Sequence, residues 1–168
     1  SFPIIGACFV IWVMCLPFFL KSGKNVYVWI LFNVGSTILY LYLEAKGANV
    51  GYYIPNRMGE GYGMSEGSLD HLIDDGANLI VTVDTGITAN AEVAHAASRG
   101  TDVVVTDHHE CHGELPSCCA IVNPHRPDCP YPFKELAGVG VVFKFLCACE
   151  ARRAGVSLDA AFETVAAQ

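Results

Sequence analysis

The fold is decided by two short stretches, Leu79-Ile80-Val81-Thr82-Val83-Asp84 and Val103-Val104-Val105-Thr106-Asp107-His108-His109. Each is almost wholly apolar and rich in β-branched residues, which is typical of strands buried on both faces of a parallel sheet. Helical patterns lie around them, at Ser68 to Asp75, Ala89 to Ser98 and Val139 to Arg153. Strands that alternate with helices predict an α/β fold, a Rossmann-like parallel sheet with helices on both faces.

The same alternation is found nearer the N-terminus. Val26 to Ile30 predicts a strand, Gly35-Ser36-Thr37 a break, and Ile38 to Lys46 a helix that ends at Gly47. Val50 to Ile54 then predicts another strand. A further strand is expected at residues 120–122. These patterns indicate a βαβ unit that extends the sheet.

A membrane hairpin is the alternative for the N-terminal region. Residues 2–20 and 25–43 carry no charge, and about 20 apolar residues are enough to span a bilayer. The βαβ pattern is the favoured interpretation of the second run. For residues 2–20, a membrane segment and a sequence artefact both stay open.

Composition limits the possible functions. The net charge of −7 disfavours nucleic-acid binding on charge alone, because phosphate contacts need a basic surface. An acidic balance is compatible with such binding if carboxylates hold metal ions and another domain supplies the cations. The 168-residue chain starts at Ser1 without Met and ends at Gln168 inside a predicted helix, so both ends look cut.

The eight cysteines do not form a recognisable framework. There is no C-x-x-C pair, which argues against structural zinc. A mixed cluster keeps zinc open as a minor alternative: Cys111, His112, Cys118, Cys119, His125 and Cys129. Reduced thiols in a cytoplasmic protein are the favoured interpretation.

The candidate site lies where the two quoted strands end. Ligands of open parallel sheets bind beyond the carboxyl ends of the strands, where Asp84, Asp107, His108 and His109 should converge. Carboxylates and imidazoles together suit Mn²⁺ or Mg²⁺. The usual chemistry is activation of water and neutralisation of a phosphoryl oxygen by two metal ions. Asp84 alone could instead cap the following helix, but adjacent histidines have no packing rationale.

Val105-Thr106-Asp107-His108-His109 resembles the signature of the DHH phosphoesterases. Other segments, in the same order, resemble the RecJ branch of that family. They are Tyr52 to Gly63, Thr82 to Ile87, Asn123 to Pro132 and Leu136 to Gly140. The resemblance covers roughly the middle three-quarters of the chain.

The resemblance implies a metal-dependent 5′-to-3′ exonuclease that acts on single-stranded DNA in recombination and repair, using Mn²⁺ or Mg²⁺ and no small-molecule cofactor. It implies that Asp84, Asp107 and His108 are metal ligands and that His109 is a ligand or contacts the scissile phosphate. The catalytic residues would then be Asp107, His108 and His109. Arg57 would hold a substrate phosphate, and Tyr62 would stack on or pack near a base.

The chain departs from the family at its first motif. An acid-rich Gly-Asp-Tyr-Asp-x-Asp-Gly normally follows the first strand, but residues 29–35 read Trp-Ile-Leu-Phe-Asn-Val-Gly. The family's last metal-binding Asp would lie beyond Gln168. Because neutral Asn33 is a poor ligand for a hard cation, we expect an incomplete metal site and an inactive chain. Either residues 1–35 are a misread frame, the favoured account, or they are a genuine divergence.

Three regions are therefore expected: an apolar segment of uncertain status (1–22), a partial DHH phosphoesterase domain (23–156) and the start of a helical region (157–168). Two other functions stay open. One is a DHH phosphoesterase that cleaves short oligonucleotides or cyclic dinucleotides. The other is a non-catalytic domain attached to a membrane through residues 2–43, in place of a cytoplasmic nuclease.

Overall fold

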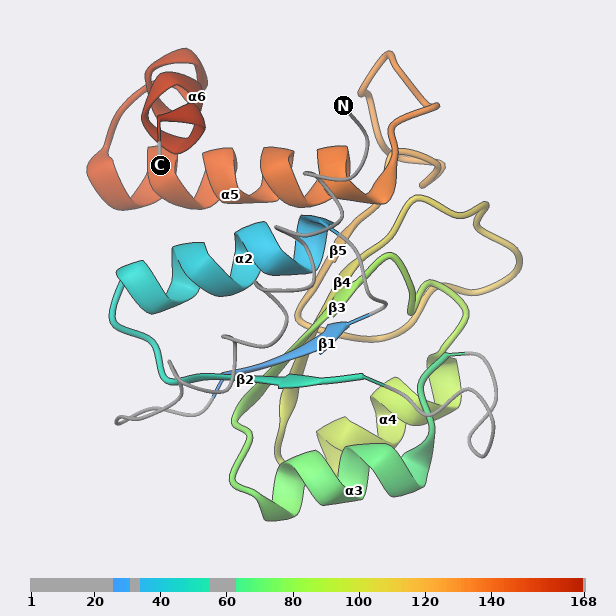
Figure 1. Ribbon diagram of the computed structural model, residues 1–168. Coiled ribbons are helices and arrows are strands. Elements are labelled where there is room, and N and C mark those ends of the chain that lie inside the picture. Colours follow the sequence, from blue (N-terminus) through green and yellow to red (C-terminus); the bar gives the residue numbers. More distant parts are fainter. Residues whose placement is uncertain (1–25, 31–33, 55–62, 168) are drawn as a thin grey trace, which may run out of the picture.

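The computed structural model describes residues 26–30, 34–54 and 63–167 (Figure 1). Ten elements follow one another in these ranges: β1 (Val26–Ile30), α2 (Val34–Ala45), β2 (Val50–Tyr53), α3 (Glu66–Asp74), β3 (Leu79–Val83), α4 (Asn90–Ser98), β4 (Asp102–Thr106), β5 (Ala120–Val122), α5 (Gly138–Ala154) and α6 (Leu158–Ala166). The predicted order of strands and helices is confirmed. The expected apolar segment 1–22 lies outside the described residues.

The five strands form one parallel sheet in the order β2-β1-β3-β4-β5. Helices α2 and α5 cover one face and α3 and α4 cover the other, while α6 packs on α5 (Figure 1). The predicted Rossmann-like α/β fold with helices on both faces is therefore confirmed. Strand order reverses between β1 and β3, and ligands of such sheets bind at this switch point.

Alternate side chains of the central strands β3 and β4 pack into two separate hydrophobic cores. Val81, Val83 and Val104 pack beneath α2 and α5 with Leu39 and Leu146. The intervening residues point to the opposite face, toward α3 and α4, and are Ile80, Val103 and Val105. Since successive side chains of a strand point to opposite faces, a run of β-branched residues fills both layers at once.

Helix α2 differs from the prediction at its start. Gly35-Ser36-Thr37 was expected to be a break, but the helix begins at Val34. Gly35 and Ser36 are buried, and the first turn of a helix has backbone N–H groups without partners in the helix in any case. The low helix propensity of these residues therefore costs little, and tertiary packing decides where α2 begins.

Helix α3 begins at Glu66 because Ser65 caps it, accepting a hydrogen bond from the Ser68 N–H.

The second apolar run forms β1 and α2, as the βαβ pattern predicted. Among the described residues, no helix is both long and apolar enough to cross a membrane. Residues 2–20, the other half of the alternative hairpin, lie outside the described residues.

A buried carboxylate joins α2 to α5. Glu150 is 2% exposed and accepts a hydrogen bond of 2.8 Å from the hydroxyl of Tyr42. Lys46 lies 3.3 Å away, and Arg153 donates two further hydrogen bonds. The hydrogen bonds from Arg153 and Tyr42 lower the pKa of Glu150 to about 2, and burial, followed by the bond to Glu150, raises the pKa of Tyr42 to about 12.

This network predicts a pH-dependent stability. The pKa of Glu150 is lowered from 4.5, so its contribution is complete above pH 4.5 and is lost as the pH falls through about 2. Glu150→Gln should therefore lower the free energy of unfolding most above pH 4.5, and the difference from the parent should shrink in acid. Urea unfolding across this pH range measures it. Glu163→Gln, on an exposed part of α6, is the matched control. If the difference in the free energy of unfolding between Glu150→Gln and the parent does not change with pH, Glu150 is not the group responsible.

Candidate metal centre

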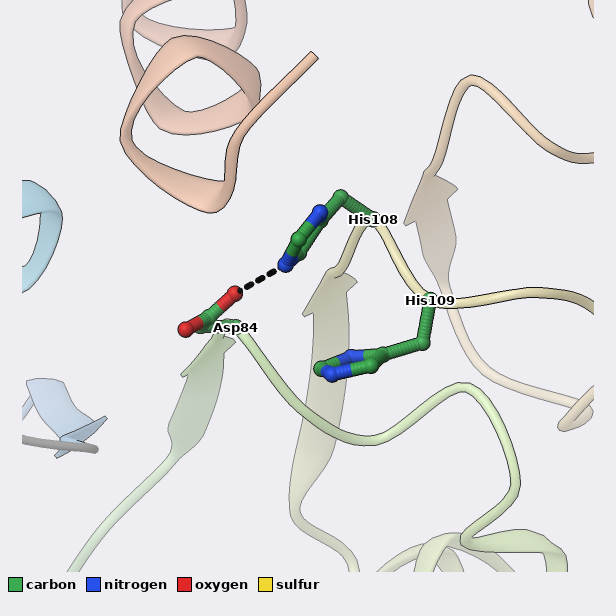
Figure 2. A group of neighbouring side chains, drawn as sticks. All are labelled: Asp84, His108 and His109. Atoms are coloured by element: carbon green, nitrogen blue, oxygen red, sulfur yellow. Dashed lines mark ion pairs between the residues drawn. The ribbon is translucent and has the colours of Figure 1, made fainter. Parts of the chain in front are cut away.

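Asp84 is displayed by an unusual backbone turn at the end of β3. Its φ is 63°, in the left-handed region that residues other than glycine rarely adopt. Its N–H still donates to the carbonyl of Thr106 at 2.9 Å, so the residue stays tied to the neighbouring strand β4. The turn directs the carboxylate along the carboxyl edge of the sheet, toward His108 (Figure 2).

His108 and His109 come from the end of β4, next to β3. The Nε2 atom of His108 lies 2.9 Å from Oδ1 of Asp84, an ion pair when the ring is protonated. The His109 ring is tilted against that of His108, with ring centroids 4.7 Å apart. The side chain of His109 is 61% exposed, so this imidazole faces solvent at the mouth of the site.

Asp107 is the most deeply buried of the four predicted ligands and is 1% exposed. Its Oδ1 accepts hydrogen bonds from the backbone N–H of His108 (2.8 Å) and of His109 (3.2 Å) and contacts Nδ1 of the His109 ring at 2.6 Å. Its Oδ2 accepts from the N–H of Ile87 at 3.0 Å. A carboxylate that bonds a ring Nδ1 leaves Nε2 as the nitrogen available to a ligand.

One ligand atom from each of Asp84, His108 and His109 can be chosen so that all lie within 4.8 Å of one another (Figure 2). One carboxylate and two imidazoles form a mixed oxygen and nitrogen donor set that suits a divalent transition metal such as Mn²⁺. Asp107 is not part of this group, and its predicted role as a ligand stays a prediction. Its four contacts favour a role in orienting His109.

The site borders the switch point of the sheet. Ile30, the last residue of β1, pairs with Val83, which precedes Asp84. Residues 31–33, which follow Ile30, lie outside the described residues. In the sequence, Leu31-Phe32-Asn33 follows β1, and there is no Asp or Glu from residue 25 to residue 43. The side of the site nearest β1 thus receives no carboxylate from this stretch of sequence.

Gly138 lets helix α5 approach Asp84. A Cβ atom at Gly138 would lie 2.3 Å from Oδ1 and 2.8 Å from Cγ of Asp84, far inside van der Waals contact. Gly138 is the first residue of α5, whose N-terminal end carries a partial positive charge that favours a neighbouring carboxylate. Because Gly138 has no side chain, the carboxylate of Asp84 can occupy the space beside the first residue of α5.

Other predicted groups do not contribute to the described site. Arg57 and Tyr62, the predicted substrate-binding residues, lie outside the described residues. Within the described ranges, the cysteine and histidine residues considered for zinc form no metal-binding group. Cysteines 111, 118, 119, 129, 147 and 149 are free thiols.

Comparisons with known proteins identify the family of this chain. A family model described as the DHH family, N-terminal domain, matches residues 33–167. The chain belongs to the DHH family. It is 51% identical over 113 residues to the single-stranded-DNA-specific exonuclease RecJ of Bacillus subtilis, and 50% identical over 101 residues to that of Escherichia coli. These matches cover 67% and 60% of this chain but only 14% and 18% of the two relatives.

Solved RecJ structures share this DHH fold. A crystal structure of exonuclease RecJ bound to manganese matches with a TM-score of 0.69 and 31% identity, covering 89% of this chain and 38% of the other. RecJ of Thermus thermophilus in complex with Mn²⁺ matches with a TM-score of 0.63 and 28% identity, covering 89% and 21%. The predicted resemblance to the RecJ branch is therefore confirmed, and the chain spans well under half the length of these relatives.

Sequence reasoning missed two residues that support the DHH site. Gly138 and Asn123, a buried amide beside His109, both lie in segments quoted for their family resemblance, yet neither was assigned a role. For Gly138, the available signal was the pair of glycines that opens a predicted helix directly after Ala137. Glycine allows a neighbouring segment to approach the backbone closely, so close packing was a reason to expect it there.

Gly138→Ala should disturb Asp84. The added methyl group must displace the Asp84 carboxylate or the end of α5, at a cost of roughly 1–3 kcal/mol in the free energy of unfolding. Mn²⁺ binding, followed by calorimetry, should weaken in parallel because Asp84 moves away from His108. Gly67→Ala is the matched control: it lies in α3 with open space around it and should stabilise by up to about 1 kcal/mol. Equal changes in the free energy of unfolding and in Mn²⁺ affinity for the two variants would contradict the close approach of Gly138 to Asp84.

Proposed function

We propose that this chain is the metal-binding part of a RecJ-like, divalent-metal-dependent 5′-to-3′ single-stranded-DNA exonuclease of recombination and repair, and that the 168-residue chain by itself is inactive. The convergence of Asp84, His108 and His109 within 4.8 Å at the carboxyl edge of a parallel sheet carries the proposal. The similarity to RecJ exonucleases over most of the chain supports the substrate class.

Asp84, His108 and His109 would hold a Mn²⁺ or Mg²⁺ ion, and imidazole ligands favour Mn²⁺. When bound, such an ion supplies an activated water and neutralises charge on a phosphoryl oxygen. Asp107 supports this set by fixing the His109 ring through its Nδ1 atom. The exposed ring of His109 would act as a ligand or contact the scissile phosphate.

The expected inactivity rests on the missing acids. A two-metal phosphodiesterase needs carboxylates that bind both ions, and residues 25–43 include no Asp or Glu. One ion held by one carboxylate and two histidines is the arrangement that the described residues support. Such a site would bind one metal ion and would leave the second metal-binding position incomplete.

Single-stranded DNA is the proposed partner, with Arg57 holding a phosphate and Tyr62 contacting a base. The net charge of −7 gives this segment little attraction for DNA by itself. We therefore assign strand binding mainly to cations elsewhere in a full-length relative. A cytoplasmic location fits the free cysteines.

Metal binding is tested first. Calorimetric titration of the chain with MnCl₂ should show a single class of site, and Asp84→Asn should weaken it at least about tenfold because a ligand is lost. Asp75→Asn is the matched control, since Asp75 forms an exposed pair with His71 on α3. Competition with MgCl₂ should show a preference for Mn²⁺. If the parent chain binds neither ion, the proposed metal centre is wrong.

Activity is tested on 5′-labelled single-stranded DNA with Mn²⁺, where we expect no release of nucleotides. Degradation that is abolished by Asp107→Ala would contradict the proposed inactivity while supporting the nuclease assignment. A substrate-length series belongs to the same assay. Cleavage restricted to short oligonucleotides or cyclic dinucleotides would replace the long-strand interpretation.

A further inference from the structure

Asn123 follows β5 in the same way that Asp107 follows β4 and Asp84 follows β3. Strands β4 and β5 pair in parallel, with Thr106 opposite Val122. The N–H of Asp107 donates to the carbonyl of Val122 at 3.0 Å. The three residues therefore form one row along the carboxyl edge of the sheet. Asp84 and Asp107 carry carboxylates, and Asn123 carries an amide.

The amide of Asn123 is buried and makes two hydrogen bonds. The side chain is 3% exposed. Its Nδ2 donates to the backbone carbonyl of His109 at 3.0 Å, and its Oδ1 accepts from the N–H of His125 at 2.8 Å. One side chain thus ties the backbone of His109 to the loop that follows β5.

A second contact joins the same two loops. Nδ1 of His125 lies 3.1 Å from Oε1 of Glu110, the residue after His109. The loop that carries His125 is itself anchored, because Arg126 donates to the carbonyl of Ile121 at 2.7 Å and Lys134 donates to that of Pro124 at 2.7 Å. Asn123 therefore holds His109 against a segment with its own fixed contacts.

We propose that Asn123 is a positioning residue for His109, acting through the His109 carbonyl; this rests on the proposed metal centre. Asp107 fixes the ring nitrogen and the N–H of His109, and Asn123 fixes its carbonyl. His109 is consequently held at three polar atoms although its side chain is 61% exposed. An exposed ring that is already oriented loses less conformational entropy when it takes up a ligand.

The chemistry of this position requires an amide. The His109 carbonyl can only accept a hydrogen bond, so its partner must donate, while the His125 N–H needs an acceptor. An aspartate in the place of Asn123 would keep the acceptor but place a second carboxylate oxygen against the carbonyl. It would also put an unpaired negative charge at a buried position. Asn123→Asp is therefore a nearly isosteric variant that replaces the amide donor with a charged acceptor.

The test compares Asn123→Ala and Asn123→Asp with the parent chain. Both variants should bind Mn²⁺ about tenfold more weakly or worse, the size typical of residues that support a ligand. In metal-free protein, the ring ¹⁵N signals of His109 should shift, whereas those of His95 should not. Asn90→Ala is the matched control, because Asn90 makes the same kind of bond, 3.0 Å to the carbonyl of Glu114, at an exposed place.

Folded variants with unchanged Mn²⁺ affinity and unchanged His109 ring signals would overturn the proposal. If both variants fail to fold, the parent chain decides. Its Asn123 side-chain amide protons should exchange slowly with solvent and show a nuclear Overhauser effect to His109, and the absence of both overturns the proposal. The metal-free measurements keep this outcome separate from the metal centre, which fails only if the parent chain itself binds no ion.

Discussion

The buried carboxylate of Asp107 is the interaction on which the rest of the site depends. A buried charge is costly unless it is fully hydrogen-bonded, and Asp107 is surrounded by the N–H groups of Ile87, His108 and His109 and by the His109 ring. These contacts join the turn after β3 to the turn after β4. Asp84 lies in the first turn, and His108 and His109 lie in the second. The Asp107 side chain therefore sets the distance between Asp84 and the two histidines that would bind a metal ion with it.

The sheet supports this arrangement from both faces. Valines of β3 and β4 pack under α2 and α5 on one side, and their neighbours pack over α3 and α4 on the other. The same α5 brings Gly138 against Asp84. Packing of the helices and placement of the carboxylate are therefore linked, and a change at the start of α5 should be felt at the metal centre.

The described residues bring Asp84, His108 and His109 together, whereas residues 25–43 include no Asp or Glu. Asp107 and Asn123 each contact His109, and Gly138 leaves room for the Asp84 carboxylate. The family model matches residues 33–167. A chain with an intact supporting shell and too few carboxylates is expected to bind one ion and to lack the complete catalytic centre.

The sequence by itself determined the parallel sheet, the strand ends at Asp84 and Asp107, and the membership of the DHH family. Apolar β-branched runs and local motifs are read directly from neighbouring residues. It misjudged the start of α2, because burial of Gly35 and Ser36 overrides their low helix propensity. Only the tertiary structure decided that Asp107 joins the turns after β3 and β4, that Gly138 adjoins Asp84 and that Asn123 holds His109. These are contacts between segments far apart in the chain, and they depend on strand register and helix packing, which no local pattern encodes.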